Sequence, residues 1–349
     1  MLKTLKQTTL RSLKRAGLSR IVENSRWRRE RLLILAYHGI SIADEHEFNH
    51  SLFMSAEVLR SRLQQLRETR CAVLPLDEAV KRLYANDLPD RAVVLTFDDG
   101  LADFYLRVYP LIREFDLPAT CYLTTFYCEF NRPVFDPMVS YLLWKGRKQS
   151  LNLKPLIGGE LKLSLRSHET QEVARVAILE HAKSEKFSAE DKDELLTKLA
   201  QELRVDYESL LAQRIIQNVT PAEVAEMAAN GIDIQLHTHR HRTPKDHALF
   251  IREIEDNRKS IESMTGKRAT HFCYPSGVYD RAFLPWLEQS GVTSATTCEV
   301  GFASVNSHRL LLPRVLDNQA LSPIEFESWL TGVSAVLPRR HVPAHKVLG

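Results

Sequence analysis

Uninterrupted runs of apolar residues recur along this chain from about residue 32, and segments with helical spacing lie between them. The runs cover 31–39, 92–97, 118–124, 270–274, 293–297 and 310–312, and the alternating run 232–236 belongs to the same series. Continuous apolar runs are typical of strands that are covered on both faces, as in a parallel sheet with helices outside it. The pattern therefore predicts an α/β fold of mainly parallel strands.

Helices are expected between these runs. The spacing of apolar residues predicts them over 55–68, 76–86, 105–115 and 246–263. One more helix has a clear beginning, since Thr220 fits the N-cap, Pro221 the first helical position and Glu223 the third position of a capping box. Gly231 fits the position just after that helix.

Residues 138–217 interrupt the alternation of strands and helices. They are rich in Leu, Lys, Glu, Ser and Gln and show mostly helical spacing. A chain of 349 residues can hold two domains or one large α/β domain. Because the alternation returns after residue 217, we predict one body over 32–330 with a helical insertion at about 138–217. The insertion either shapes access to a site or is an accessory or oligomer-forming subdomain. Residues 331–349 are predicted to form a C-terminal tail.

Positive charge is concentrated in residues 1–31. This segment holds ten Lys and Arg residues against Glu23 and Glu30, a net +8, and because the whole chain carries +3 the remainder carries −5. Contact with anionic lipid or an acidic partner, a solvated arm, and a helix packed on the body all remain open. Nucleic acid is disfavoured as a partner, because the body is acidic and shows no known reader motif.

The basic segment does not resemble a secretory signal, because it has no continuous apolar stretch and no small-residue cleavage site. The five cysteines are odd in number and lack zinc-ribbon or disulfide-framework spacing, which indicates free thiols in a reducing compartment. We therefore expect a cytoplasmic protein, with peripheral contact to the inner membrane face through residues 1–31.

Polar side chains capable of chemistry follow several of the predicted strands. They are His38, Asp98, Asp99, His237, Tyr274 and, near the last run, Arg314. In parallel α/β folds the reactive groups gather at the carboxyl ends of the strands. We therefore expect these side chains to lie near one another, which is stronger evidence for a site than any one of them.

Two short motifs carry most of this chemistry, Thr96-Phe97-Asp98-Asp99-Gly100 and His237-Thr238-His239-Arg240-His241. Taken alone, an Asp-Asp-Gly is typical of a turn and a histidine pair is typical of a surface or core. Together at strand ends they favour a metal centre, because two histidines and one carboxylate suit Zn²⁺ or a similar first-row ion and leave a second carboxylate as a base. His239, between the two ligand positions, is expected to point away.

These two motifs resemble the first two motifs of the polysaccharide deacetylase family, the NodB-type domain of carbohydrate esterase family 4. Weaker similarities are Tyr37-His38-Gly39-Ile40, the run 118–124 and Tyr274-Pro275-Ser276-Gly277. The resemblance covers about residues 32–330. It implies a deformed (β/α) barrel and the removal of N-acetyl or related acyl groups from amino sugars with a divalent metal.

The resemblance also implies roles for individual residues. Asp98 takes the place of the general base, and Asp99, His237 and His241 take the places of the metal ligands. The expected metal is Zn²⁺, with Co²⁺ or Ni²⁺ as alternatives. The oxyanion of the tetrahedral intermediate is expected to meet the metal and a backbone N–H of the Tyr274 region.

The sequence departs from the family pattern at three places. Cys273 stands where an arginine commonly steadies the base, Ser276 replaces an aromatic residue, and the late Leu-x-His motif that supplies the general acid is absent after residue 314. Arg314 is expected to supply the missing guanidinium from a neighbouring strand. His38 is the candidate general acid.

The sequence thus predicts a metal-dependent hydrolase that removes the N-acetyl group from an amino sugar of a poly- or oligosaccharide, or of a lipid- or nucleotide-linked precursor. One alternative is an amidohydrolase or deformylase acting on another C–N amide. A second is a non-catalytic carbohydrate-binding protein with a deacetylase-like fold, which the missing motif elements favour and the intact Asp98, Asp99, His237 and His241 oppose.

Overall fold

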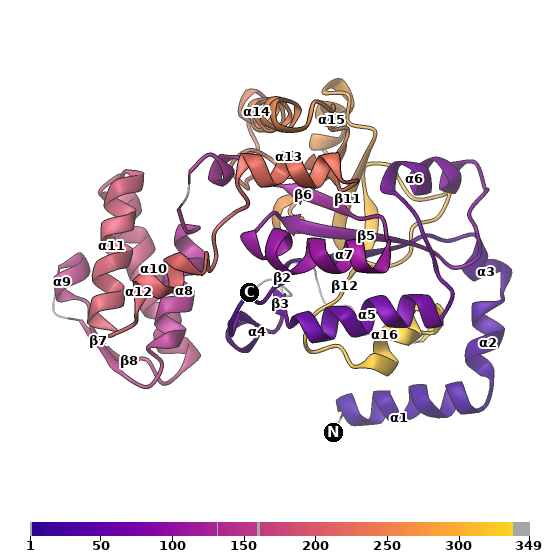
Figure 1. Cartoon of the computed structure of the whole chain (residues 1–349), viewed down its shortest axis with the longest axis horizontal. Helices are drawn as coiled ribbons and strands as arrows, with labels where there is room; N and C mark the ends of the chain where they lie inside the picture. The colour runs from indigo at the N-terminus through magenta and orange to yellow at the C-terminus, as the bar shows by residue number, and fades with distance from the viewer. Residues whose placement is uncertain (1, 131, 159–160, 338–349) are drawn as a thin grey trace.

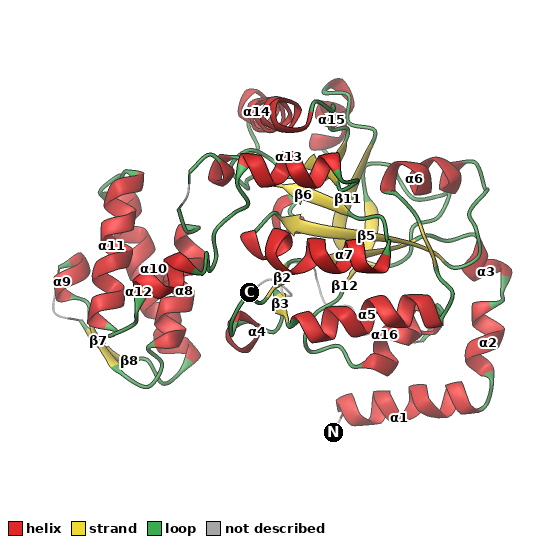
Figure 2. Ribbon diagram, viewed as in Figure 1, coloured by secondary structure: helices red, strands yellow, loops and turns green. Residues whose placement is uncertain are grey.

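A closed barrel of parallel strands forms the centre of the molecule (Figures 1 and 2). The computed structural model describes residues 2–130, 132–158 and 161–337. Within these ranges, seven strands follow one another in the order β1-β12-β11-β10-β9-β6-β5, and the pairing of β5 with β1 closes the ring. They are β1 (Leu33–Tyr37), β5 (Ala92–Asp99), β6 (Thr120–Leu123), β9 (Asp233–Leu236), β10 (His271–Cys273), β11 (Ser294–Val300) and β12 (Leu312–Leu316). The predicted (β/α) barrel is confirmed.

Helices cover the outside of the barrel, which explains why its strands read as continuous apolar runs. Those around the barrel are α5 (Ala56–Glu68), α6 (Leu76–Tyr84), α7 (Tyr109–Phe115), α13 (Pro221–Ala229), α14 (His247–Thr265), α15 (Phe283–Gln289) and α16 (Pro323–Leu330). The capping box of α13 is present as predicted, with Thr220 and Glu223 bonded reciprocally and Gly231 at a φ of 93° just after the helix.

Two strand boundaries differ from the sequence interpretation in ways that matter for the site. β5 continues through Asp98 and Asp99, so both carboxylates belong to the strand itself. β12 begins at Leu312, whereas the sequence placed a strand over 310–312, and Arg314 therefore lies inside the barrel wall. A polar residue within an apolar strand is hidden from a search for continuous apolar runs.

Shorter elements complete the barrel region. β4 (Ala72–Val73) pairs with the first residues of β5, and β2 (Gly39–Ile40) pairs in parallel with β3 (Phe53–Met54) beside α4 (Glu45–Phe48). The predicted helix over 105–115 has two parts, a π-helical turn at Phe104–Val108 and then α7. Pro110 comes just after the junction of the two parts. Because proline has no backbone N–H, it needs no hydrogen-bond acceptor where the bonding pattern changes from π-helical to α-helical.

The insertion stands apart from the barrel on the left of Figure 1. It contains α8 (Phe135–Lys145), α9 (Lys154–Ile157), α10 (His168–Ser184), α11 (Ala189–Glu202), α12 (Tyr207–Ala212) and the hairpin of β7 (Ser150–Asn152) and β8 (Lys162–Ser164). The sequence did not predict this hairpin, because strands of three residues are too short to show alternation. Leucines from α8 and α11, with Ala174, Ile178 and Ala182 from α10, build a core separate from that of the barrel.

The insertion interrupts the connection from β6 to α13, which makes it an enlarged strand-to-helix loop. Such loops lie at the carboxyl ends of barrel strands, where active sites form. Its position is therefore compatible with a role in access to the site.

The basic N-terminal segment forms α1 (Leu2–Arg15), α2 (Leu18–Glu23) and α3 (Arg26–Arg29). α1 lies along α16, with Lys6 paired to Glu325 at 3.0 Å and Lys14 to Glu327 at 2.6 Å. Of the arrangements left open by the sequence, the structure shows a helix packed on the body. None of the described helices is both long enough and apolar enough to cross a bilayer.

The predicted C-terminal tail begins with structure. Residues 333–336 form α17 (Val333–Val336), which packs beside α16 with Val333 buried. The remainder of the predicted tail, 338–349, lies outside the described residues.

Candidate active site

The site is built at the carboxyl end of β5, where two neighbouring aspartates diverge. Asp98 is buried, 4% exposed, while Asp99 has a left-handed backbone with a φ of 73°. Gly100 follows at a φ of +72°, and a Cβ there would lie 2.2 Å from the Leu123 side chain. Only glycine fits this turn, and strained backbone of this kind is typical of functional sites. The turn presents the two carboxylates to different surroundings.

Asp99 faces two imidazoles. Its Oδ1 lies 3.2 Å from His237 Nε2 and 3.2 Å from His241 Nε2. The three ligand atoms lie within 4.8 Å of one another. Tetrahedral ligands bound at about 2.1 Å are separated by about 3.4 Å, so these distances match the spacing that a metal ion imposes. The structure thus brings the three predicted ligands together.

Hydrogen bonding fixes the orientation of His237. Its Nδ1 lies 2.9 Å from the Cys273 carbonyl oxygen, which only accepts, so Nδ1 carries the proton. In the neutral ring Nε2 then holds a lone pair that faces the Asp99 carboxylate. Two acceptors at 3.2 Å need either a proton or a metal ion between them. A histidine held by a carbonyl on its far nitrogen is typical of metal ligands.

The loop after β9 returns His241 to the same side as His237. Thr238 and His241 both have left-handed backbones, with φ of 61° and 53°, and the Thr238 hydroxyl accepts the Arg242 N–H at 3.0 Å. The His239 ring points elsewhere, with Nδ1 2.9 Å from the Thr125 hydroxyl. The predicted orientation of His239, away from the two ligand histidines, is confirmed.

The charges of this cluster shift the pKa values of its members. Burial alone would raise the pKa of Asp99, but His241 and His237 hold it well below its ordinary value. Burial lowers the pKa of His241, and the Asp99 charge more than reverses this, so the net shift is upward. The carboxylate thus stays ionised, in the form that binds a metal.

Asp98 is held by Arg314, as the sequence led us to expect. The guanidinium donates to Asp98 Oδ1 at 2.8 Å and to Oδ2 at 2.7 Å, and a third N–H donates to the Thr297 carbonyl. Burial would raise the pKa of Asp98, but the Arg314 charge outweighs it and lowers that pKa. Asp98 is therefore an oriented, ionised carboxylate next to the three ligands.

Comparisons with known proteins agree with this geometry. The polysaccharide deacetylase family model matches residues 85–141 and 195–295, which contain all four motif side chains, Asp98, Asp99, His237 and His241. This chain belongs to the polysaccharide deacetylase family. Members of the family are hydrolases of carbon–nitrogen bonds, which agrees with the predicted enzyme class. The unmatched residues 142–194 fall within the insertion.

Curated relatives share parts of the chain. A poly-β-1,6-N-acetyl-D-glucosamine N-deacetylase of Escherichia coli K12 is 31% identical over 96 residues, which is 27% of this chain and 14% of the relative. The chain thus aligns with about one seventh of that relative's length. The putative polysaccharide deacetylase YxkH of Bacillus subtilis is 21% identical over 306 residues, 86% of this chain and 76% of the relative.

Solved deacetylase structures share the fold. The Streptococcus pyogenes deacetylase PplD, in complex with acetate, superposes with a TM-score of 0.56 at 20% identity, covering 84% of this chain and 96% of that one. IcaB from Ammonifex degensii superposes with a TM-score of 0.54 at 16% identity, covering 86% and 97%.

Departures from the deacetylase pattern gather around the base. Cys273 Sγ lies 3.5 Å from Asp98 Oδ2 and 3.1 Å from an Arg314 nitrogen. Burial raises the pKa of this thiol well above its usual range, which keeps it neutral. The guanidinium therefore comes from β12 while the β10 position holds a small neutral side chain.

For the two remaining predicted residues, His38 and Tyr274, the structure gives weaker support for the expected roles. His38 Nε2 lies 3.7 Å from Asp98 Oδ2, and its side chain is 12% exposed, so it reaches both the base and the surface. Tyr274 is buried, its hydroxyl donates to the Leu310 carbonyl and its N–H donates to the Thr296 carbonyl at 3.2 Å. An oxyanion role for the Tyr274 N–H requires that bond to open. Both roles stay predictions.

Sequence reasoning missed Asn257. Its side-chain oxygen accepts the His237 N–H at 2.9 Å, and its amide donates to the Leu123 carbonyl and the Thr125 hydroxyl. Asn257 therefore ties the first ligand to the end of β6. A signal was available, because Asn257 lies on the buried face of α14 with Phe250, where a polar residue needs partners.

Proposed function

We propose that this protein removes the N-acetyl group from an amino sugar of a saccharide by metal-dependent hydrolysis. The observation that carries the proposal is the triad of Asp99, His237 and His241, with a lone pair and a carboxylate oxygen facing each other. Asp98 beside it supplies the second carboxylate that such a reaction needs.

The donor set fits a divalent first-row ion. One carboxylate oxygen and two imidazole nitrogens give three protein ligands and leave room for a water and the substrate, as in catalytic zinc sites. When bound, the ion supplies polarisation of the acyl carbonyl and acidification of the water. Zn²⁺ is our first choice, with Co²⁺ or Ni²⁺ as alternatives.

Asp98 accepts the proton of the attacking water. Arg314 occupies both carboxylate oxygens in one plane, so the base cannot rotate away, and its charge keeps Asp98 ionised. The Cys273 thiol also lies 3.5 Å from Oδ2, so the second lone pair of Oδ1 is the one that receives the proton. General base catalysis of this kind contributes about 10²–10⁴-fold to the rate.

His38 donates a proton to the departing amine. It is next to Asp98 and partly exposed, which supports it as our candidate for the role that the absent Leu-x-His motif leaves open. Asp98 Oδ2 lies 3.7 Å from His38 Nε2, so a small movement of the ring lets the proton pass from Asp98 to a neutral His38 and from there to the amine.

A saccharide substrate is supported by the relatives. The aligned Escherichia coli protein is named for poly-β-1,6-N-acetyl-D-glucosamine, and the PplD structure holds acetate, the other product expected of such a reaction. We extend an N-acetylated glucosamine oligomer to this chain as the first substrate to test.

We place the protein at the cytoplasmic face of a membrane. Leu5, Leu18 and Ile21 are exposed on α1 and α2, and the same helices carry exposed Arg15 and Arg20, so this segment offers the apolar and basic side chains that suit anionic lipid. Sedimentation with anionic vesicles tests this, and it fails if a Leu18→Ser, Ile21→Ser variant sediments as well as the native chain.

The test of the activity is acetate release from N-acetylglucosamine oligomers by the zinc-loaded chain. Native protein should release acetate, and Asp98→Asn should release at least about 100-fold less while keeping its metal. Release of formate from a formylated amide but no acetate would favour the deformylase alternative. Saccharide binding without turnover in the metal-loaded protein would favour a non-catalytic binder.

A further inference from the structure

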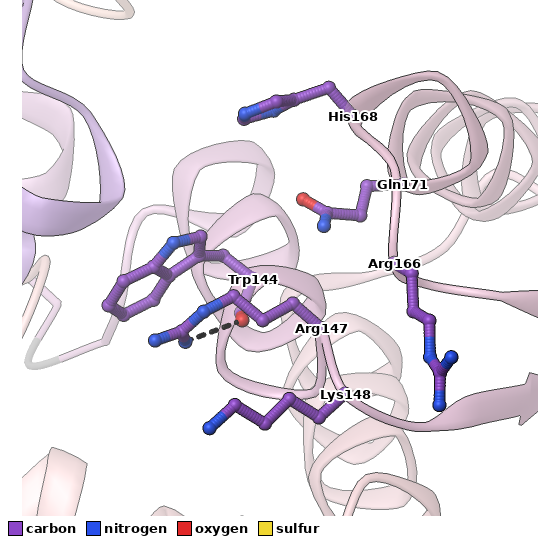
Figure 3. A pocket seen from close by; sticks show the side chains of 6 residues that line it. All are labelled: Trp144, Arg147, Lys148, Arg166, His168 and Gln171. Atoms are coloured by element: carbon purple, nitrogen blue, oxygen red, sulfur yellow. Dashed lines mark hydrogen bonds between the residues drawn. The ribbon is translucent and has the colours of Figure 1, made fainter.

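A hollow lies on the insertion, away from the metal triad. It encloses about 500 Å³ and is lined by Trp144, Arg147, Lys148, Arg166, His168 and Gln171 (Figure 3). These residues come from the end of α8, the segment that follows it, and the start of α10. We call this hollow the basic pocket. Its volume suits a small ligand or one group of a larger one.

The cations of the basic pocket differ from their neighbours in their pairing with acidic residues. Among the described residues, no ion pair involves Arg147, Lys148 or Arg166. Nearby cations are paired: Lys145 lies 2.7 Å from Asp44, and Arg175 lies 2.8 Å from Asp136. The hollow therefore gathers three cations for which no ion pair is found among the described residues.

Arg147 is held in place without being neutralised. Its guanidinium lies 3.9 Å from the centre of the Trp144 ring, and one N–H donates to the Trp144 carbonyl at 3.0 Å. Trp144 is itself buried, 6% exposed. A guanidinium has five N–H donors, so most of them stay available, and stacking reduces the entropy lost when they bind.

The start of α10 adds to the positive potential. His168 is the first residue of this 17-residue helix, and the Ser167 side chain accepts the Thr170 N–H. The positive end of the helix dipole therefore meets the hollow. Figure 3 shows His168 on the rim, and Gln171 projecting between α10 and Trp144.

We propose that the basic pocket binds a phosphoryl group. Three cations, one of them preoriented, together with an amide and an imidazole, suit an anion with several oxygens and more than one negative charge. The group belongs either to a soluble phosphate or diphosphate or to a lipid headgroup, which share this chemistry. None of the six lining residues is part of the metal triad or its neighbours, so the proposal does not depend on the proposed function.

The test is calorimetric titration of the intact chain with pyrophosphate and with inorganic phosphate. The variant is Arg147→Gln with Arg166→Gln, and the control is Lys162→Gln, an exposed lysine of β8 that does not line the pocket. We expect the double variant to weaken pyrophosphate binding at least about tenfold and the control to change it less than twofold.

A second measurement separates the sources of the phosphoryl group. Phosphatidylglycerol vesicles are sedimented with the native chain and both variants. If the double variant no longer sediments with the vesicles while the native chain and the control still do, the group belongs to a lipid headgroup. If the double variant binds pyrophosphate more weakly but sediments like the native chain, the group belongs to a soluble phosphate. Unchanged metal content and circular dichroism show that the variants are folded. Equal behaviour of the native chain and the double variant with every probe, including no binding by either, overturns the proposal.

Discussion

The metal triad and the basic pocket show opposite imbalances of hydrogen-bonding and charge. At the triad, the Nε2 lone pair of a neutral His237 meets a carboxylate oxygen, so an acceptor faces an acceptor. At the basic pocket, guanidinium and ammonium donors meet no carboxylate in the described part of the chain. The first arrangement needs a cation and the second needs an anion. Unmatched groups held rigidly are therefore the best guide to what each region binds.

Removal of the base should separate chemistry from metal binding most sharply. Asp98→Asn keeps the shape of the side chain and should lower kcat for acetate release by about 10²–10⁴-fold. The metal content should not change, because Asp98 is not one of the three ligands. Parallel loss of metal and activity would show that Asp98 belongs to the triad.

Loss of Arg314 should act through Asp98. Arg314→Met leaves a buried carboxylate unpaired, and we expect a fall in kcat of at least about tenfold and a loss of about 3–5 kcal/mol in the free energy of unfolding. Arg314→Lys restores a charge without the bidentate geometry and should recover part of both. A steady-state assay and urea unfolding measure the two effects. Full activity in Arg314→Met would contradict the positioning role.

Because the barrel and the insertion have separate hydrophobic cores, the metal triad and the basic pocket can be perturbed one at a time. Leu142 lies in the core of the insertion and Leu35 in that of the barrel, both 0% exposed. Each change to alanine should lower the free energy of unfolding by about 2–5 kcal/mol. Leu142→Ala should weaken pyrophosphate binding and spare metal affinity, and Leu35→Ala should do the reverse. Equal effects of either variant on both ligands would show one coupled structure.

The smallest expected effect concerns the contact of α1 with the body. Burial raises the pKa of Glu325, but the Ser322 hydroxyl and Lys6 outweigh it and lower that pKa from 4.5 to about 2. A depressed folded-state pKa gives stability that is present above pH 4.5 and is lost as the pH falls towards 2. Lys6→Gln should flatten this dependence in urea unfolding between pH 5 and 2.5, roughly the window that linkage predicts. An unchanged slope would exclude Lys6 as the cause.

Much of the barrel and the triad could be predicted because local pattern and fold agree. Continuous apolar runs mark buried parallel strands, and residues following such strands converge on one edge, so Asp99, His237 and His241 could be placed together from their positions alone. The link between Asp98 and Arg314 was expected from the resemblance to the deacetylase family, whose usual arginine is absent here, and from the suitability of a guanidinium for orienting a carboxylate.

The rest depends on contacts that sequence spacing does not encode. The π-helical turn at 104–108, the three-residue hairpin strands and Asn257 behind His237 arise from tertiary packing. The basic pocket was equally hidden, because Arg147 and Arg166 are separated by a hairpin that brings them to one hollow. Charges are counted along a sequence, but their pairing is decided only by the fold.

The metal content of the purified protein tests the central claim most directly. It is measured by elemental analysis, after loosely bound ions are removed, for the native chain, His237→Ala and the control His247→Ala, an exposed histidine at the start of α14. The account predicts about one divalent ion per chain in the native protein and the control, and none in His237→Ala. Native protein that holds no ion and takes up none from added Zn²⁺, Co²⁺ or Ni²⁺ would contradict it.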